Sequence, residues 1–522
     1  MSSSPSNSPS FSSPEQQTSK NKTRLRIIII GAGPTGLLLA HIFSQLQGKV
    51  EAGIEFIVLE RRSREEIARP EHGAALVIWP HTMRVMDQLG LLEGARAIGV
   101  ETDELKVCDA RAREYHRLAL EDWTRSLHGA NPLFFHRAEF LRLLYDSLPP
   151  GVQDKIITGK AFADIQTDPD QEDGGVVVTC SDGTIKRGDI VIGADGVHSK
   201  VREVIMRESA KMNKAGESAV GIREKHDPFV AEFRCVFGYT AHLLPGLEPR
   251  KIYEMHSTGA SSQVFTFRDK AGFMIYQKMD RPSTLNNRST EGPETGKTKR
   301  RYTFSDVEEF MLQVGNFPVA SCDKQANGTG SVKVNDLYKA SCWTVLSDLH
   351  EGIVDHWHAG GAGRMVLVGD AASKQTPNMG HGWNCCVQDV VVLSNLISSL
   401  VKSKSHQDDE QAVTVEGLDV LFTEYQRTRY PLSKACLETS MNWARSQAWD
   451  SWWYWFLNRH VQTTVSTLMW ATKIQPMVYG LGPQMHLGHV LNFLPERSKL
   501  KGVIPWVNVS PDGRQDQEEA QV

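Results

Sequence analysis

A segment near the start of this chain places the tightest constraint on its fold. Residues 25–30, Leu-Arg-Ile-Ile-Ile-Ile, are almost wholly apolar, which is typical of a strand buried on both faces of a parallel sheet. Gly-Ala-Gly-Pro-Thr-Gly follows at residues 31–36, and the apolar run at 37–43 has the character of a packed helix. A second apolar run at 55–59 predicts another strand. The order strand, glycine-rich turn, helix and strand predicts a βαβ unit.

Three glycines and one acid in this segment suit the binding of a dinucleotide. Gly31 permits a tight turn, Gly33 lets the backbone approach a pyrophosphate, and Gly36 lets the helix pack against the strand. The helix N-terminus offers free N–H groups and a positive dipole end to phosphates. Glu60, which ends the second strand, can accept hydrogen bonds from a ribose hydroxyl and favours FAD or NAD over NADP. The alternative is an ordinary glycine-rich turn between a strand and a helix.

Length and composition indicate a globular protein of a reducing compartment. The chain has 522 residues, enough for two or three domains, and its formal net charge of −4 gives no reason to expect nucleic acid as a partner. Its eight cysteines include no Cys-x-x-Cys pair, so we expect no metal site and an intracellular location. Residues 1–22 are rich in Ser and Pro and predict a disordered tail, and no secretory apolar stretch precedes Ile27.

Two further strands lead into turns that carry an aspartate. The predicted strand Asp-Ile-Val-Ile-Gly at 189–193 continues as Ala-Asp-Gly, where Asp195 can hold backbone N–H groups ahead of a helix that carries Arg202. The run at 364–368 continues as Gly-Asp-Ala-Ala, where Asp370 is suited to a sugar hydroxyl at the carboxyl edge of an open sheet.

The residues after Asp370 predict a surface for a flavin ring. Gly380 and Gly382 precede an apolar helix that we expect from Cys385 to Leu400, so their backbone N–H groups can face such a ring. Arg137 lies at a predicted strand-to-helix junction, which is a natural place for a phosphate or flavin contact; the alternative is a surface arginine.

The rest of the chain predicts a sheet and a helical end. Residues 227–280 alternate apolar and polar, which indicates an antiparallel sheet that can form a wall for a substrate, and residues 281–301 predict a long loop. Six tryptophans lie between Trp443 and Trp470, interrupted by cations. This pattern fits either contact with a membrane interface or packing on the rest of the protein.

Taken together, these motifs resemble the FAD-dependent monooxygenases of the p-hydroxybenzoate-hydroxylase class. The resemblance covers residues 24–440, and Lys374, Thr376-Pro377-Asn378 and Asn384 make it similar to the fungal paxilline-epoxidase type within that class. It implies an α/β fold in which a Rossmann-type FAD-binding domain is interleaved with an antiparallel-sheet substrate domain. The implied boundaries are a tail at 1–22, FAD-binding parts at 23–226 and 346–440, a substrate-facing sheet at 227–345, and a Trp-rich helical C-terminal region at 441–522.

The resemblance also implies roles for individual residues. Arg202 falls where the class places a functional arginine, and it is our candidate catalytic residue. Trp383 stands where a small residue is usual, so it can narrow the pocket beside the flavin. Together with the residues named for the dinucleotide, the expected FAD contacts are Gly31, Gly33, Gly36, Glu60, Gly73, Ala74, Arg137, Asp195, Asp370, Gly380, Gly382 and Trp383.

The implied function is the transfer of one oxygen atom from O2 to a small lipophilic molecule, with FAD as cofactor and NAD(P)H as reductant. Fungal relatives of this type epoxidise prenyl chains of indole diterpenes and meroterpenoids. The alternatives are a phenol hydroxylase, a flavin-dependent dehydrogenase or reductase of an isoprenoid, and an FAD-fold protein without chemistry. A phenol substrate would benefit from a base, and the sequence names none.

Overall fold

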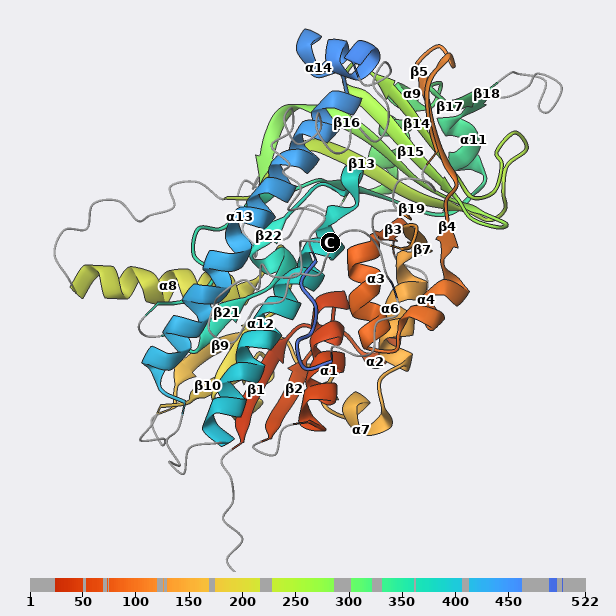
Figure 1. Cartoon of the computed structure of the whole chain (residues 1–522). Coiled ribbons are helices and arrows are strands. Elements are labelled where there is room, and N and C mark those ends of the chain that lie inside the picture. Colours follow the sequence, from red (N-terminus) through yellow and green to blue (C-terminus); the bar gives the residue numbers. More distant parts are fainter. Residues whose placement is uncertain are drawn as a thin grey trace, which may run out of the picture.

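The fold is described from a computed structural model of the whole chain (Figure 1). It describes residues 24–49, 53–68, 73, 75–119, 125, 129–168, 174–215, 228–285, 302–321, 331–360, 363–405, 413–461, 488–494 and 500. The predicted tail at 1–22 and most of the predicted loop at 281–301 lie outside these residues.

A five-stranded sheet forms the lower half of the molecule in Figure 1, in the order β21-β12-β1-β2-β8, with every pair parallel. The strand predicted at 25–30 is β1, and its apolar side chains are buried on both faces, as the sequence pattern requires. The bounds of the five strands are Leu25–Ile30 (β1), Ile54–Leu59 (β2), Ile156–Ile157 (β8), Ile190–Gly193 (β12) and Met365–Leu367 (β21).

Helices cover this sheet and its carboxyl edge. Helix α1 (Pro34–Gln47) packs against α12 (His381–Ser405), which packs against the long α13 (Val415–Gln447). Helix α8 (Lys200–Ala215) contacts β21 and the small antiparallel sheet of β9 (Phe162–Thr167), β10 (Val176–Cys180) and β11 (Ile185–Gly188). The shorter helices are α2 (Arg64–Ala68), α3 (Pro80–Gln88), α4 (Leu92–Ile98), α6 (Arg137–Asp146) and α7 (Pro150–Gln153).

A seven-stranded sheet forms the upper half in Figure 1, in the order β19-β13-β16-β15-β14-β5-β6. It confirms the antiparallel sheet predicted over 227–280, but it also recruits β5 and β6 from the first part of the chain, and β5 pairs parallel to β14. Residues 281–284, expected in a loop, instead extend β16. The bounds are Glu104–Asp109 (β5), Glu114–Ala119 (β6), Val230–Thr240 (β13), Lys251–Ser257 (β14), Ala260–Thr266 (β15), Ala271–Thr284 (β16) and Ser341–Asp348 (β19).

Shorter helices and strands pack around the two sheets. Helices α9 (Phe304–Val314) and α11 (Val334–Lys339) pack on the upper sheet beside the hairpin of β17 (Pro318–Ser321) and β18 (Ser331–Lys333). Three strands, β3 (Ala75–Ile78), β7 (Leu133–His136) and β4 (Val100–Glu101), form a separate antiparallel sheet. Between β21 and α12 lie η1 (Gly369–Ala371), β22 (Ser373–Lys374), which pairs with β20 (Gly352–Ile353), and η2 (Pro377–Met379).

The described C-terminal residues pack on the rest of the fold. Helix α14 (Trp452–Phe456) and η3 (Leu457–Val461) follow α13 at the upper sheet, and Trp449 Nε1 donates to the Asn458 amide oxygen at 3.1 Å. Residues 488–494 return to the lower half, where the Gln88 side chain bonds the backbone of Leu491 and Leu494. Packing therefore accounts for residues 488–494, whereas helix α14 has no buried residue and most of 462–494 lies outside the described chain.

Helix α12 is the one helix in the described chain that is long and apolar enough to span a membrane. Its segment His381–Ser403 meets that test by length and composition, but 83% of the apolar window is buried inside the protein. The helix begins four residues earlier than predicted, so Gly382 and Trp383 lie in its first turn.

A buried ion pair joins α12 to α13. Arg429 Nε donates to Asp389 Oδ1 at 2.8 Å, and the two side chains are only 4% and 1% exposed. Burial raises the pKa of Asp389, while Arg429, Ser433 and the Gly369 backbone N–H oppose that rise. Asp389 therefore connects the two helices to the turn that carries Asp370.

We expect Arg429→Met to lower the free energy of unfolding by about 3–5 kcal/mol, because it leaves the Asp389 carboxylate buried without its cation. The matched control is Arg427→Met on the same helix, where a 68% exposed arginine pairs with Glu424. The control should change stability by less than about 0.5 kcal/mol. Urea unfolding of both variants measures the difference, and equal stabilities would contradict the role of the buried pair.

Candidate active site

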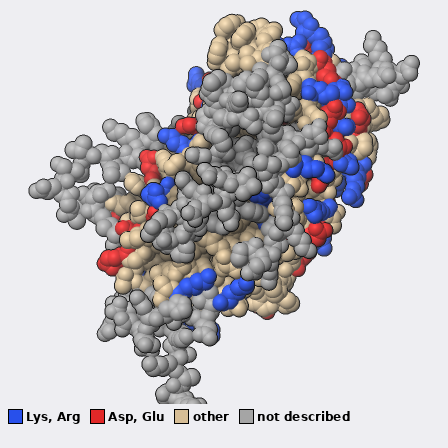
Figure 2. All heavy atoms as spheres, viewed as in Figure 1, with Lys and Arg blue, Asp and Glu red and all other residues tan. Residues whose placement is uncertain are grey.

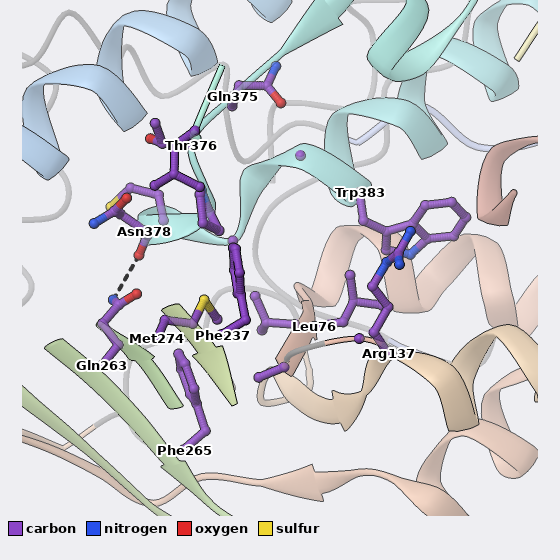
Figure 3. Close-up of a pocket in the computed structure, with 18 of the residues that line it drawn as sticks. Leu76, Arg137, Phe237, Gln263, Phe265, Met274, Gln375, Thr376, Asn378 and Trp383 are labelled. Carbon is purple, nitrogen blue, oxygen red and sulfur yellow. Dashed lines mark hydrogen bonds between the residues drawn. The ribbon is translucent and has the colours of Figure 1, made fainter. Parts of the chain in front are cut away.

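A cavity of about 720 Å³ lies between the carboxyl edge of the parallel sheet and the seven-stranded sheet. Its lower wall contains residues of the predicted FAD site, and its upper wall is mostly apolar. Figure 3 shows Arg137 and Trp383 on one side of this space and Phe237, Phe265 and Met274 on the other. Six of the thirteen predicted site residues line this cavity: Gly73, Arg137, Asp370, Gly380, Gly382 and Trp383.

The β1–α1 turn has the geometry that a dinucleotide requires. Gly31 has φ +103°, and a Cβ on it would lie 2.6 Å from the Ala194 carbonyl oxygen. A Cβ on Gly36 would lie 1.9 Å from the Gly31 carbonyl oxygen. By contrast, a Cβ on Gly33 would meet no atom of the described residues within 4 Å, and none of their side chains caps the N-terminus of α1. The free helix end and the open space fit a phosphate group.

Glu60 ends β2 as predicted and is 4% exposed. Its carboxylate accepts hydrogen bonds from the Ala32 backbone N–H at 2.7 Å and from Arg62 Nε at 2.9 Å. Burial raises the pKa of Glu60, but the bonds from Arg62 and Ala32 together hold that pKa below its ordinary value. The side chain is thus an ionised acceptor beside the glycine-rich turn, which suits a ribose hydroxyl.

In the structure, the side chains of Asp195 and Arg202 form hydrogen bonds with backbone groups and thereby stabilise turns. Asp195 Oδ2 accepts from the backbone N–H of Lys200 at 2.8 Å at the start of α8, and burial raises the pKa of this carboxyl group. Arg202 donates to the carbonyl oxygens of Ala371 and Val197 at 3.0 and 2.7 Å and lies over the Phe229 ring.

Neither residue lines the cavity. Arg202 therefore connects the turn after β12 to the turn after β21, and the catalytic role expected from the resemblance stays a prediction.

Arg137 on α6 and Asp370 on η1 both line the cavity. Arg137 begins α6, its side chain is exposed at the cavity, and its guanidinium makes no hydrogen bond or ion pair with the described residues. Asp370 Oδ2 accepts from Lys374 Nζ at 2.6 Å. Gly73 has φ +145°, and a Cβ there would lie 2.9 Å from Arg137 Cβ. Ala74, the alternative to Gly73, lies outside the described residues.

The segment from Gln375 to Trp383 offers several polar atoms to the cavity. Gly380 has φ +65°, and a Cβ on it would meet Val77 Cγ1 at 2.0 Å, while Gly382 also lines the space. Trp383 packs edge-on against Phe140 with ring centroids 5.6 Å apart. Its Nε1 is buried and has no hydrogen-bond partner among the described residues, and the same holds for Gln375 Oε1, Thr376 Oγ1 and Asn378 Oδ1. Unpaired donors and acceptors on one wall fit a flavin ring, which carries both.

Sequence reasoning missed the polar residues of the upper wall. Glu254, Gln263 and His116 line the cavity from three strands of the seven-stranded sheet. Their signal in the sequence is weak, because single polar residues in alternating strands are more often on the solvent face. Among the described residues, no group of three or more His, Cys, Asp and Glu is arranged to hold a metal ion.

Comparison with known proteins agrees with this geometry. The FAD binding domain family model matches residues 24–239 and 248–413. The FAD-dependent monooxygenase ausM of Penicillium brasilianum is 29% identical over 440 residues, which are 83% of this chain and 82% of that protein. The FAD-dependent monooxygenase penE of Penicillium thymicola is 28% identical over 501 residues, 94% of this chain and 92% of that protein.

A solved structure shares the fold. A variant of Klebsiella pneumoniae HpxO, crystallised in complex with FAD, superimposes with a TM-score of 0.60 at 18% identity, covering 88% of this chain and 100% of that one. At this level of identity the likeness concerns the fold alone.

We expect Gly33→Leu to weaken FAD binding by about tenfold or more, because the new side chain fills the open space at the α1 N-terminus. The fold should tolerate it, since no atom in the described part of the chain lies within 4 Å of the new Cβ. Gly151→Leu, which also enters open space, is the control. FAD titration by fluorescence and thermal unfolding of the FAD-free proteins measure the two effects. Unchanged FAD affinity in Gly33→Leu would contradict the assignment of the phosphate position.

Proposed function

Since this chain belongs to the FAD binding domain family and is an FAD-dependent monooxygenase, we propose that it oxygenates a lipophilic prenylated secondary metabolite. The substrate would be a meroterpenoid or an indole diterpene, and the reaction an epoxidation, a hydroxylation or an oxidative cyclisation. The observation that carries this proposal is the apolar upper wall of the cavity. Its side chains include Leu105, Leu118, Phe134, Phe237, Phe265 and Met274.

The residues of this chain would bind the cofactor and exclude water from the reaction. Bound FAD supplies the chemistry, because it accepts electrons from NAD(P)H and activates O2. The β1–α1 turn and Glu60 would hold the dinucleotide, while Arg137 and the segment Gln375–Trp383 would hold the flavin end. The apolar wall keeps water away and positions the substrate close to the flavin, and such positioning supplies much of a rate enhancement.

A phenol hydroxylase is the second candidate for the type of reaction. The observation that favours it is the buried Glu254 carboxylate on the cavity wall, since oxygenation of a phenol ring benefits from a base. The dehydrogenase or reductase alternative has weaker support, because the relatives are named as monooxygenases.

Membrane contact through the C-terminal region belongs to the same proposal, together with an intracellular location, cytoplasmic or membrane-associated. Trp452 and Trp453 on α14 are 69% and 55% exposed, and aromatic side chains of this kind suit a membrane interface. Figure 2 shows an uncharged surface at the top of the molecule, where α14 lies in Figure 1. A lipophilic substrate could enter the enzyme from such a surface.

We expect the purified protein to show a flavin spectrum and to oxidise NADPH faster in the presence of farnesylated or geranylgeranylated aromatics. The product should gain one oxygen atom by mass spectrometry and should carry ¹⁸O when ¹⁸O2 is supplied. The matched control is the corresponding aromatic without its prenyl chain, which cannot fill the apolar wall. Bound FAD together with no oxygenated product from any prenylated aromatic would contradict the proposed substrate class.

A further inference from the structure

A row of side chains crosses the seven-stranded sheet on the face that lines the cavity. The register of neighbouring strands places one residue of each in this row: His116, Val107, Glu254, Gln263, Met274 and Phe237. All of these except Val107 line the cavity. The row is apolar at the Phe237 end and polar around Glu254, so the upper wall has a polar end.

Glu254 is held in this row by hydrogen bonds to both carboxylate oxygens. Gln263 Nε2 donates to Glu254 Oε1 at 2.6 Å, and His256 Nε2 lies 2.9 Å from Glu254 Oε2. Gln263 Nε2 also donates to the Asn378 carbonyl oxygen at 2.9 Å, a contact that Figure 3 marks with a dashed line. Because Asn378 belongs to the segment that faces the expected flavin ring, Glu254 lies close to the place of reaction.

A second layer fixes His256 behind the carboxylate. The Tyr115 hydroxyl lies 2.7 Å from His256 Nδ1 and 2.8 Å from Asn458 Oδ1, which in turn lies 3.0 Å from His256 Nδ1. Glu254, His256, Gln263 and Asn458 are 4%, 1%, 3% and 2% exposed. A buried network with this many bonds fixes the orientation of the carboxylate.

The charged and titratable groups around Glu254 come from four elements. Tyr115 and His116 lie on β6, Cys108 and Asp109 on β5, Tyr276 on β16 and Arg459 on η3. Burial, and next the charge of Glu254, raises the pKa of Tyr115, so this phenol stays protonated at neutral pH. Burial lowers the pKa of His116, which is therefore neutral at neutral pH. Arg459 lies over the Tyr115 ring, 4.1 Å from its centroid, and also near Asp109.

The two other carboxylates that line the cavity have different partners. Asp370 is paired with Lys374, and Asp348 accepts hydrogen bonds from the hydroxyls of Ser283 and Tyr302. Glu254 faces the cavity with an amide and an imidazole as its partners. Among the carboxylates of the upper wall, Glu254 is therefore the one best suited to accept a hydrogen bond from a bound molecule.

We propose that Glu254 binds an acidic hydroxyl of the substrate, a phenol or an enol, and takes its proton during oxygenation, with His256 as a positioning residue. The proposal rests on the proposed function, because it assigns a substrate class to the same cavity. A prenylated aromatic would place its ring hydroxyl against Glu254 and its prenyl chain along the apolar wall. The ring would then lie beside the segment that contains Asn378.

The proton balance of this step is simple. The ring carbon next to the hydroxyl-bearing carbon forms a bond to one atom of O2, which is the oxidant. The O–O bond breaks, and the two electrons that reduced FAD would supply take the other oxygen atom to water. As that bond forms, the hydroxyl oxygen becomes a carbonyl oxygen, its O–H bond breaks, and the proton goes to the Glu254 carboxylate. The resulting ketone recovers the aromatic ring when the hydrogen on the oxygenated carbon leaves as a proton to solvent and the carbonyl oxygen takes back the proton held by Glu254. When an alkene of the prenyl chain is epoxidised instead, the hydroxyl stays bonded to Glu254 and only orients the substrate.

The test compares Glu254→Gln with the wild-type holoenzyme on prenylated phenols and on their O-methyl ethers. We expect product formation from the phenols to fall about 100-fold where the ring is oxygenated and about tenfold where the chain is epoxidised. The ethers, which cannot donate a hydrogen bond, should change little. His256→Gln should give a phenol-to-ether ratio between those of the wild type and Glu254→Gln, because the carboxylate is present but less fixed. The control is Glu248→Gln, which removes a 59% exposed carboxylate outside the cavity.

A binding experiment tests the same assignment without turnover. The probe is 4-nitrophenol, whose bound phenol and phenolate are distinguished by difference absorbance. A carboxylate favours the neutral, hydrogen-donating phenol, so Glu254→Gln should lower the apparent pKa of the bound probe by about one unit. Arg137, Lys374, Asp348 and Asp370 also face the cavity, but they are the same in both proteins.

The outcomes separate this proposal from the proposed function. Equal losses for phenols and ethers, or an unchanged apparent pKa of the probe, would overturn the role of Glu254. If the wild type oxygenates no prenylated aromatic, the proposed substrate class fails, and the titration of 4-nitrophenol still decides whether Glu254 binds a hydroxyl. Retained FAD content in each variant shows that the fold is intact.

Discussion

The close approach of backbone at the carboxyl edge of β1 is the constraint on which the rest of this structure depends. The Gly31 carbonyl lies against Gly36, and Gly31 itself lies against the Ala194 carbonyl, so neither glycine has room for a side chain. Gly369, with φ +62°, is close to Thr35 in the same way. The turns after β1, β12 and β21 therefore touch one another. Their contact brings Glu60, Asp195 and Asp370 to one edge of the sheet, although they are far apart in the sequence.

The two walls of the cavity differ in electrostatic character. The lower wall presents Arg137, Lys374 and the free N-terminus of α1, which suit the phosphates and the ring of an anionic cofactor. The upper wall presents apolar side chains with the carboxylate of Glu254 among them. An anionic cofactor would lie against the positively charged lower wall. A neutral substrate with one acidic hydroxyl would lie against the apolar upper wall that carries the Glu254 carboxylate. The difference in charge would keep the two molecules in their own halves of the cavity.

The parts of the site that consist of residues contiguous in the sequence could be predicted from it. The strand at 25–30, the glycine positions, Glu60, Arg137 and Asp370 all have the expected places, because a turn between a strand and a helix depends on local chemistry. Helix α12 starts four residues before its predicted start, because Gly382 and Trp383 are poor local signals of a helix. The sequence predicts a functional role for Arg202. In the structure its guanidinium donates hydrogen bonds to backbone carbonyl oxygens, and one of these belongs to Ala371, which is distant in the sequence.

The polar cluster around Glu254 could not be predicted, because it depends on pairing between strands that are far apart in the chain. β14 pairs with β5, which is about 150 residues earlier, and Asn458, which bonds to Tyr115, is 343 residues later in the chain. A shift of one residue in the register of β14 would move Glu254 to the opposite face of the sheet. In our proposal, local turns would hold the cofactor, whereas the substrate would contact residues that long-range strand pairing brings together. Relatives that keep the turns can therefore differ in substrate by changing a few positions in this row, without disturbing how FAD is held.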